Sequence, residues 1–259
     1  MGRIHVGTSG YSFKDWVGPY YPSGTKSTEM LELYARDFDT VEVNYTYYRL
    51  PSEETTAGMV RKTPDGFRFF VKAHRSATHE RDLSDTAGFL CALAPMRAEG
   101  KLSGILFQFP QSFKNGEENR KYLKALAEEF GDDLPLAVEF RDSSWDLEPV
   151  YGYLERLGLN FVAVDEPEVS TLFPRTARAT GEVAYLRLHS RNGAKWYKGG
   201  AQRYDYLYSE EELREWLPGL RAMAKRARNL FVYFNNCHAA QAVANASRMR
   251  EILGQARLW

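Results

Sequence analysis

The sequence predicts an α/β fold of the closed (β/α)8 type, a TIM barrel, forming a single domain over residues 1–259. Strand-like segments alternate with helix-length segments, an alternation typical of parallel sheets. Eight strand-like segments occur in a chain of the length usual for this barrel. No linker, short repeat or low-complexity tract divides the chain, so one domain is expected.

The strand-like segments are short, rich in β-branched and aromatic residues, and roughly evenly spaced. They cover residues 3–9, 40–44, 67–74, 104–110, 136–141, 160–167, 183–190 and 230–236. Helix-length patterns cover residues 27–38, 52–63, 83–100, 115–130, 147–158, 209–227 and 239–256. Ser209 precedes Glu212 by three residues, and Ser52 precedes Thr55 by three, so capped helix starts are expected there. Residues 168–182 show no helical period, and we expect irregular structure in that segment.

Composition narrows the classes of function. Thirty-four basic residues balance thirty-four acidic ones without a run of like charge, which does not favour a nucleic-acid or membrane-surface partner. Neither a secretory signal nor a membrane-spanning apolar run occurs in the sequence. Cys91 and Cys237 have no metal-ligand or disulfide-framework spacing, which suits a reducing compartment. We therefore expect a cytoplasmic protein without a membrane partner, with nucleic acid possible but not favoured and the oligomeric state not predicted.

Polar residues recur on one face of strand after strand. In "LAVEFR", for example, Glu139 and Arg141 alternate with Val138 and Phe140. The apolar face must pack against helices, so the polar face is expected to point into the barrel near the carboxyl ends of the strands, where barrel enzymes keep their chemistry. On the sixth strand this pattern assigns Val162 and Val164 to the helix face and Asp165 to the interior. The predicted inward set is Glu42, Asn44, Lys72, His74, Gln108, Glu139, Arg141, Asp165, Arg187, His189 and Asn235.

Such a set could consist only of structural ion pairs. Burying a charge costs several kcal/mol, and a well-packed apolar replacement is often as stable. A large polar set at strand ends therefore favours a binding or catalytic site over a purely structural role.

Ordered motifs along the chain resemble those of a known family. They are "VGTSGYS", "YYP", "VEVNYTYYRLP", "PDGFRFFVKAHRSATH", "ILFQFP", "VEFRDSSW", "YLRLHS" and "FNN". Over about residues 3 to 253 they resemble the YecE-like barrel family, domain of unknown function 72. The resemblance implies a (β/α)8 barrel of uncharacterised activity. It also carries over the family's motif polar residues, here Glu42, Asn44, Lys72, His79, Gln108, Glu139, Arg141, Arg187, His189 and Asn235.

The predicted site supports an enzyme that acts on a small anionic ligand, phosphorylated or sugar-like. Lys72, Arg141 and Arg187 are inward cations that suit phosphate or carboxylate. Glu42 and Glu139 are the candidate acid and base, and His189 is the candidate proton shuttle. The predicted ligand-binding residues are Asn44, Lys72, His79, Gln108, Arg141, Asp165, Arg187, Tyr197, Asn235 and Asn236. Hydrolase, isomerase and lyase chemistry are not distinguished.

Two alternative functions stay open at this point. Glu139, Asp165 and His189 could bind a divalent metal as part of a hydrolase or isomerase. A non-catalytic module that binds nucleic acid or a metabolite is the other alternative. No cofactor is predicted, because the sequence contains neither a P-loop nor a G-x-G-x-x-G motif. Aromatic residues after the strands could stack on a sugar or base, or could only cover the barrel.

Overall fold

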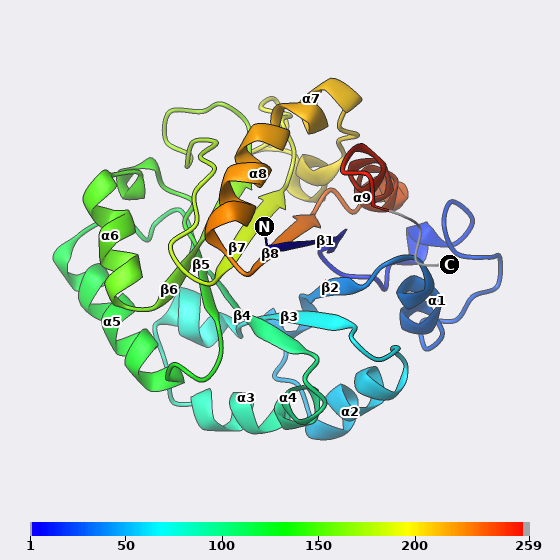
Figure 1. Cartoon of the computed structure of the whole chain (residues 1–259), viewed down its shortest axis with the longest axis horizontal. Coiled ribbons are helices and arrows are strands. Elements are labelled where there is room, and N and C mark those ends of the chain that lie inside the picture. The colour runs from blue at the N-terminus through cyan, green and yellow to red at the C-terminus, as the bar shows by residue number, and fades with distance from the viewer. Residues whose placement is uncertain (1, 256–259) are drawn as a thin grey trace.

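The computed structural model, which describes residues 2–255, contains eight parallel strands in the order β1-β8-β7-β6-β5-β4-β3-β2 (Figure 1). The strands are β1 (Arg3–Thr8), β2 (Thr40–Val43), β3 (Arg68–Lys72), β4 (Leu102–Gln108), β5 (Leu136–Glu139), β6 (Leu159–Asp165), β7 (Val183–Leu188) and β8 (Asn229–Phe234). A parallel bridge between Ser9 and Glu42 joins β1 to β2, and the Gly10 N–H donates to the Glu42 carbonyl at 2.8 Å. The predicted (β/α)8 barrel is confirmed.

A close backbone approach marks the seam between β1 and β2. A Cβ atom on Gly7 would lie 2.4 Å from the Thr40 carbonyl oxygen, which is shorter than any ordinary contact. Only glycine therefore allows β1 to approach β2 closely enough for the bridge between Ser9 and Glu42.

Helices surround the strands (Figure 1); within residues 2–255 they lie between successive strands except between β6 and β7, and α9 follows β8. They are α1 (Met30–Asp37), α2 (Glu53–Arg61), α3 (Thr86–Ala92), α4 (Ala94–Ala98), α5 (Glu117–Phe130), α6 (Glu148–Arg156), α7 (Glu210–Glu215), α8 (Leu217–Arg226) and α9 (Gln241–Ile252). Ser52 caps α2, and Ser209 forms a full capping box with Glu212, as predicted. Residue 256, the end of the last predicted helix, lies outside the described residues. No helix within residues 2–255 is long and apolar enough to span a membrane.

Two predicted helices are each divided in two. The segment 83–100 forms α3 and α4, with Pro95 in the first turn of α4. The segment 209–227 forms α7 and α8, with Pro218 in the first turn of α8. Proline has no N–H to donate and its ring clashes with the preceding turn, so each helix restarts at the proline. The segment 168–182, all of it described, contains no helix, as predicted.

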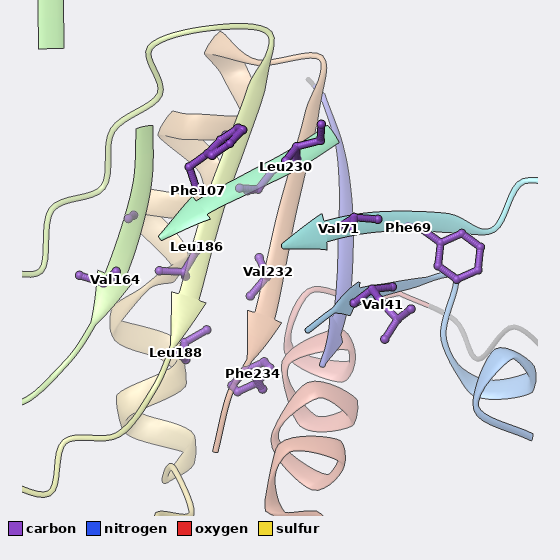
Figure 2. Packing of buried hydrophobic residues seen from close by; sticks show 14 of the residues in the cluster. Val41, Phe69, Val71, Phe107, Val164, Leu186, Leu188, Leu230, Val232 and Phe234 are labelled. Carbon is purple, nitrogen blue, oxygen red and sulfur yellow. The ribbon is translucent and has the colours of Figure 1, made fainter. Parts of the chain in front are cut away.

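Apolar residues on the outward face of the strands pack under the helices. Figure 2 shows several of them, among them Leu186 and Leu188 on β7 and Val232 and Phe234 on β8. A separate cluster of buried apolar and aromatic side chains fills the barrel interior below the polar residues. This interior cluster contains Phe70, Leu106, Ala137, Val162, Val183, Tyr185, Phe231 and Tyr233. The interior is thus layered, with an aromatic floor and a polar ring above it.

The predicted orientation of β6 is wrong for Val162 and Asp165, whereas Val164 belongs to the outer cluster as predicted (Figure 2). Val162 belongs to the interior cluster, whereas the neighbouring Phe161 packs against Tyr151 of α6 with ring centroids 5.2 Å apart. All seven residues of β6 are buried and apolar residues occupy both of its faces, so alternation does not identify the inward face. Asp165 consequently faces the helices, and the residue after it turns toward the barrel mouth.

Candidate active site at the carboxyl ends of the strands

Five charged side chains form a continuous row across the barrel mouth. We call the row of Glu42, Arg187, Glu139, Arg141 and Glu166 the charge row. Arg187 donates to Glu42 through Nε at 2.9 Å and through Nη2 at 2.8 Å, and its Nη1 lies 2.6 Å from Glu139 Oε2. Arg141 Nη2 lies 2.7 Å from Glu139 Oε1, and Arg141 Nη1 bonds Glu166 Oε1. Acidic and basic groups alternate, so each guanidinium lies between two carboxylates.

The aromatic floor supports the Glu42 end of the row. The Tyr185 hydroxyl donates to Glu42 Oε2 at 2.5 Å, and the Asn44 amide donates to Oε1 at 2.9 Å. Glu42 therefore accepts bonds from Arg187, Tyr185 and Asn44 while fully buried. A carboxylate with this many donors is held firmly in one position.

Glu166, which the sequence reasoning did not select, occupies the other end of the row. It follows β6 directly and is buried, with 2% of its surface exposed. Among the described residues, its Oε2 atom has no hydrogen-bond partner. Glu166 also lines a pocket of about 580 Å³ formed by the β6–β7 connection. The sequence does contain a signal that points to Glu166. Asp165 and Glu166 are adjacent, and only one of two adjacent strand residues can face inward, so Glu166 is the alternative to Asp165.

Asp165 belongs to a different network, so the prediction that it lies in the polar ring is wrong. The Trp216 indole N–H donates to Asp165 Oδ2 at 2.6 Å, and Arg191 Nη2 donates to the same atom at 2.8 Å. The Tyr208 hydroxyl lies 3.3 Å from Oδ1. These partners follow β7 or lie at the α7–α8 junction, so Asp165 fastens that connection to the outer side of the barrel.

Burial and neighbouring charges shift the pKa values of Glu139 and Glu166 in opposite directions. Burial alone would raise the pKa of Glu139, but Arg141 and Arg187 hold that pKa well below its usual value. Burial raises the pKa of Glu166 to about 8 against the opposing effect of Arg141. With Glu166 protonated, the row holds two carboxylates and two guanidinium groups, and its net charge is zero. The row thus carries a transferable proton at the Glu166 end.

Lys72 lies beside the row without a carboxylate partner. Its ammonium donates to Gln108 Oε1 at 2.9 Å and lies 4.5 Å from the centre of the Tyr47 ring. Within residues 2–255, no carboxylate comes within ion-pair distance of it. Burial and the nearby positive charge of Arg187 lower the pKa of Lys72 to about 7. At neutral pH the amine is therefore present in both its charged and its free form.

His189 stands at the same end of the site as Glu166. Arg141 Nη2 contacts His189 Nε2 at 3.2 Å, and the Asn235 amide contacts Nδ1 at 2.9 Å. Burial and the charge of Arg141 lower the pKa of His189 to about 3, so its ring is neutral under ordinary conditions. The buried Trp196, from the loop after β7, lies 5.9 Å from the Arg141 guanidinium. At this position an aromatic residue covers the site.

The remaining predicted residues lie at the edge of the mouth or behind it. His79, on a π-helical turn after β3 (Ser76–Glu80), packs edge-on against Tyr47 with ring centroids 5.1 Å apart. Tyr197 is 55% exposed and contacts Gln111 and Thr171 on neighbouring loops. Asn236 donates to the Tyr206 carbonyl and to Asn245 of α9. The Asn236 amide nitrogen thus holds the loop before α7 against α9, while its Oδ1 has no hydrogen-bond partner among the described residues, and its part in ligand binding stays a prediction.

Of the three predicted metal ligands, Glu139 and His189 lie together, with His189 Nε2 3.4 Å from Glu139 Oε1, whereas Asp165 lies in a different network. Among the described residues, Glu139, Glu166 and His189 offer ligand atoms within 4.8 Å of one another. Arg141 contacts all three of these side chains. Its guanidinium is therefore the cation that this group already binds, and a divalent metal would have to displace it.

These features define the protein as a (β/α)8-barrel protein with a buried, charge-balanced site at the carboxyl ends of its strands. The family model "Protein of unknown function DUF72" matches residues 5–258, and the chain belongs to this family. The resemblance in the sequence motifs is thereby confirmed.

The relatives agree with this assignment. The UPF0759 protein YunF of Bacillus subtilis is 32% identical over 272 residues, which cover 96% of this chain and 94% of YunF. A DUF72 family protein (TM1631) from Thermotoga maritima has a similar crystal structure, with a TM-score of 0.90, 40% identity and coverage of 98% of this chain and all of that one. Another DUF72 family protein (EF0366), from Enterococcus faecalis, has a TM-score of 0.85 at 27% identity, covering 98% of this chain and 96% of its own. The family and the barrel are established by these similarities, whereas the activity is not.

Proposed function

We propose that the protein is an enzyme that performs acid–base chemistry on a small ligand with an anionic group, phosphorylated or sugar-like, at the mouth of the barrel. The observation that carries this proposal is the position of Glu166. Its carboxyl is buried at the neutral end of the charge row, and one of its oxygen atoms has no partner among the described residues. A buried carboxyl that keeps its proton at neutral pH is the form that a general acid requires.

The neighbouring groups support a division of roles. The pKa of Glu139 lies well below its usual value and that of Glu166 is raised to about 8, so environment separates two carboxyl groups of one site into a charge stabiliser and a proton donor. Lys72, whose pKa is lowered to about 7, is the candidate base. His189, whose pKa is lowered to about 3, is a weak base and is proposed as a neutral hydrogen-bonding partner of the ligand. Glu42 and Glu139, the acid and base expected from sequence, are held in ion pairs by Arg187, which suits structural and electrostatic roles better than proton transfer.

An anionic ligand is proposed because two basic side chains of the site, Lys72 and Arg141, have N–H groups that no carboxylate of the described residues accepts. Arg187 is 2% exposed and fully engaged by Glu42 and Glu139, so its part in ligand binding, expected from sequence, is weakened. Lys72 has only neutral partners, and Arg141 Nε has no partner among the described residues. These two cations are the ones that a phosphate or carboxylate group would meet.

Ligand binding can be tested by thermal unfolding of the wild-type protein with inorganic phosphate, ribose 5-phosphate, glucose 6-phosphate and 3-phosphoglycerate. A compound present at about ten times its Kd stabilises the folded state by about 1.4 kcal/mol, which corresponds to a rise in Tm of about 3–6 °C. Lys72→Met should abolish the rise. Lys114→Met, which removes an exposed lysine on the loop after β4, should leave the rise unchanged.

Turnover of any stabilising compound can then be followed by proton NMR with wild type and Glu166→Gln. We expect the variant to bind the compound but to lose turnover by a factor of about 100 or more, because general acid catalysis typically contributes that much. Binding without turnover in the wild type would instead identify a non-catalytic binding protein. No Tm rise with any anion at millimolar concentration would contradict the proposal.

A further inference from the structure

We propose that Lys72 is a nucleophile that forms an imine with the carbonyl group of an aldehyde or ketone ligand. This inference rests on the proposed function, because it identifies the anionic ligand as a carbonyl compound. It starts from the surroundings of the ammonium group. Lys72 is the last residue of β3 and is intermediate in burial, unlike the three fully buried residues that precede it on this strand.

The partners of Lys72 position its amine but do not require that it be protonated. The Gln108 amide donates to the Phe109 carbonyl at 2.8 Å, and this bond turns Oε1 of Gln108 toward Lys72. An amide oxygen accepts a hydrogen bond from either an ammonium or a free amine. The Tyr47 ring, on the other hand, favours a positive charge at this position, and an iminium ion would keep that charge.

Lys101 shows how the same fold holds a structural lysine. It is buried, and its ammonium donates to the Val60 carbonyl at 3.0 Å and to the carbonyl and hydroxyl oxygens of Thr63 at 2.8 and 3.2 Å. Three oxygen atoms at the end of α2 thus satisfy all three of its N–H groups. Lys72 has one such oxygen partner, so its remaining N–H positions are available to a ligand.

The charged groups around Lys72 favour loss of its proton before attack. The groups that face it are Arg187 on β7, Glu42 on β2, Glu139 at the end of β5, Arg141 just after β5, and His79 after β3. Burial and Arg187 lower the pKa of Lys72 to about 7. Burial is the largest cause, the like charge of Arg187 acts in the same direction, and the carboxylates Glu139 and Glu42 oppose both.

The covalent step is balanced within the site. The free amine attacks the carbonyl carbon, a C–N bond forms, and the carbonyl oxygen takes up two protons and leaves as water. Starting from the ammonium form, two of its three protons leave with the oxygen and one stays on the iminium nitrogen. No oxidant or reductant takes part. The iminium ion then withdraws electrons from the adjacent carbon, which makes bonds to that carbon easier to break.

The test is reductive trapping on the full-length wild-type protein. Glyoxylate, a small anionic aldehyde, is added with sodium cyanoborohydride at pH 7.5, and modified lysines are quantified by peptide mass spectrometry. We expect Lys72 to react at least about ten-fold faster than the exposed Lys62 and the buried Lys101, because most of its amine is unprotonated at that pH. Labelling of Lys72 no faster than Lys62 would overturn the inference.

A matched variant tests the role of the neutral partner. Gln108→Glu places a carboxylate next to Lys72 and should raise the pKa of Lys72 from about 7 to about 8 or higher, so the labelling rate at pH 7.5 should fall about three-fold or more. An unchanged rate would show that Gln108 does not control the amine. Formaldehyde, an uncharged probe, separates the two proposals: rapid labelling by formaldehyde but not by glyoxylate would count against an anionic ligand. A Tm rise with sugar phosphates but no labelling by either probe would overturn the imine and leave the proposed function standing.

Discussion

Replacing Glu139 by Gln tests whether the charge row holds the barrel together. Glu139 pairs with Arg187 at 2.6 Å and with Arg141 at 2.7 Å, and all three side chains are nearly or fully buried. Removing one partner of a buried ion pair costs about 3–5 kcal/mol, because a charge stays buried without compensation. Each arginine keeps a second carboxyl group, Glu42 or Glu166, so the expected loss lies at the lower end, about 3 kcal/mol.

Urea unfolding of the variant beside wild type measures this loss, and a fall in Tm of about 6–12 °C should accompany it. Glu128→Gln is a matched control. Its carboxylate is 66% exposed and lies 3.6 Å from Lys124 on the same helix, so its removal should cost less than about 0.5 kcal/mol. If Glu139→Gln costs less than about 1 kcal/mol or stabilises the protein, the charge row is not a structural element. The Glu139 charge would then be kept for chemistry.

Three further predictions follow from the same groups. Glu166 keeps its proton up to about pH 8 in the folded state, whereas the unfolded chain loses it near pH 4.5. Wild-type stability should therefore fall as the pH rises through this window, and Glu166 should contribute up to about 1.4 kcal/mol per pH unit. Glu166→Gln should remove that component in urea unfolding at pH 5, 6.5 and 8, and parallel pH curves for the two proteins would contradict it. Lys72 should change the stability in the opposite direction with pH. Its pKa is lowered from 10.5 to about 7 in the folded state, so between these pH values the unfolded chain binds more protons than the folded one. Stability should therefore rise with pH in this window in wild type, but not in Lys72→Met. Mn²⁺ should raise the Tm of Arg141→Ala but not the Tm of wild type. Elemental analysis of wild type purified without chelator should find no stoichiometric metal. A rise in the Tm of wild type with Mn²⁺ would mean that Arg141 moves aside.

The barrel and most of the inward ring were predictable from the sequence because alternation is informative where one face of a strand is apolar and the other polar. Glu139 on β5 and Arg187 on β7 were located in this way, since Val138 and Leu186 mark the helix side. On β6 apolar residues occupy both faces, so alternation placed Asp165 inside and missed Glu166. Pro95 and Pro218 mark the points in the sequence at which the two predicted helices divide.

Pairing within the ring was not predictable, because it depends on the three-dimensional arrangement. Glu42 and Arg187 are 145 residues apart in the chain, and nothing local to either residue indicates the other. The same holds for proton affinities. The raised pKa of Glu166 and the lowered pKa of Glu139 depend on how many guanidinium groups each carboxyl meets once it is buried.

The seam between β1 and β2 has a consequence for how the chain folds. Glu42 closes the barrel through its backbone and begins the charge row through its side chain. Its partner Arg187 lies on β7, which pairs with β6 and β8 and not with β2, so the two side chains meet only across the interior of the barrel. A half-barrel that contained only one of the two residues would bury the charge of Glu42 or of Arg187 without its partner. A strand that slipped by one residue would turn its charged side chain toward the apolar layer under the helices. Incomplete and misaligned assemblies therefore carry an electrostatic penalty that the finished barrel does not, and this penalty favours one closed topology during folding.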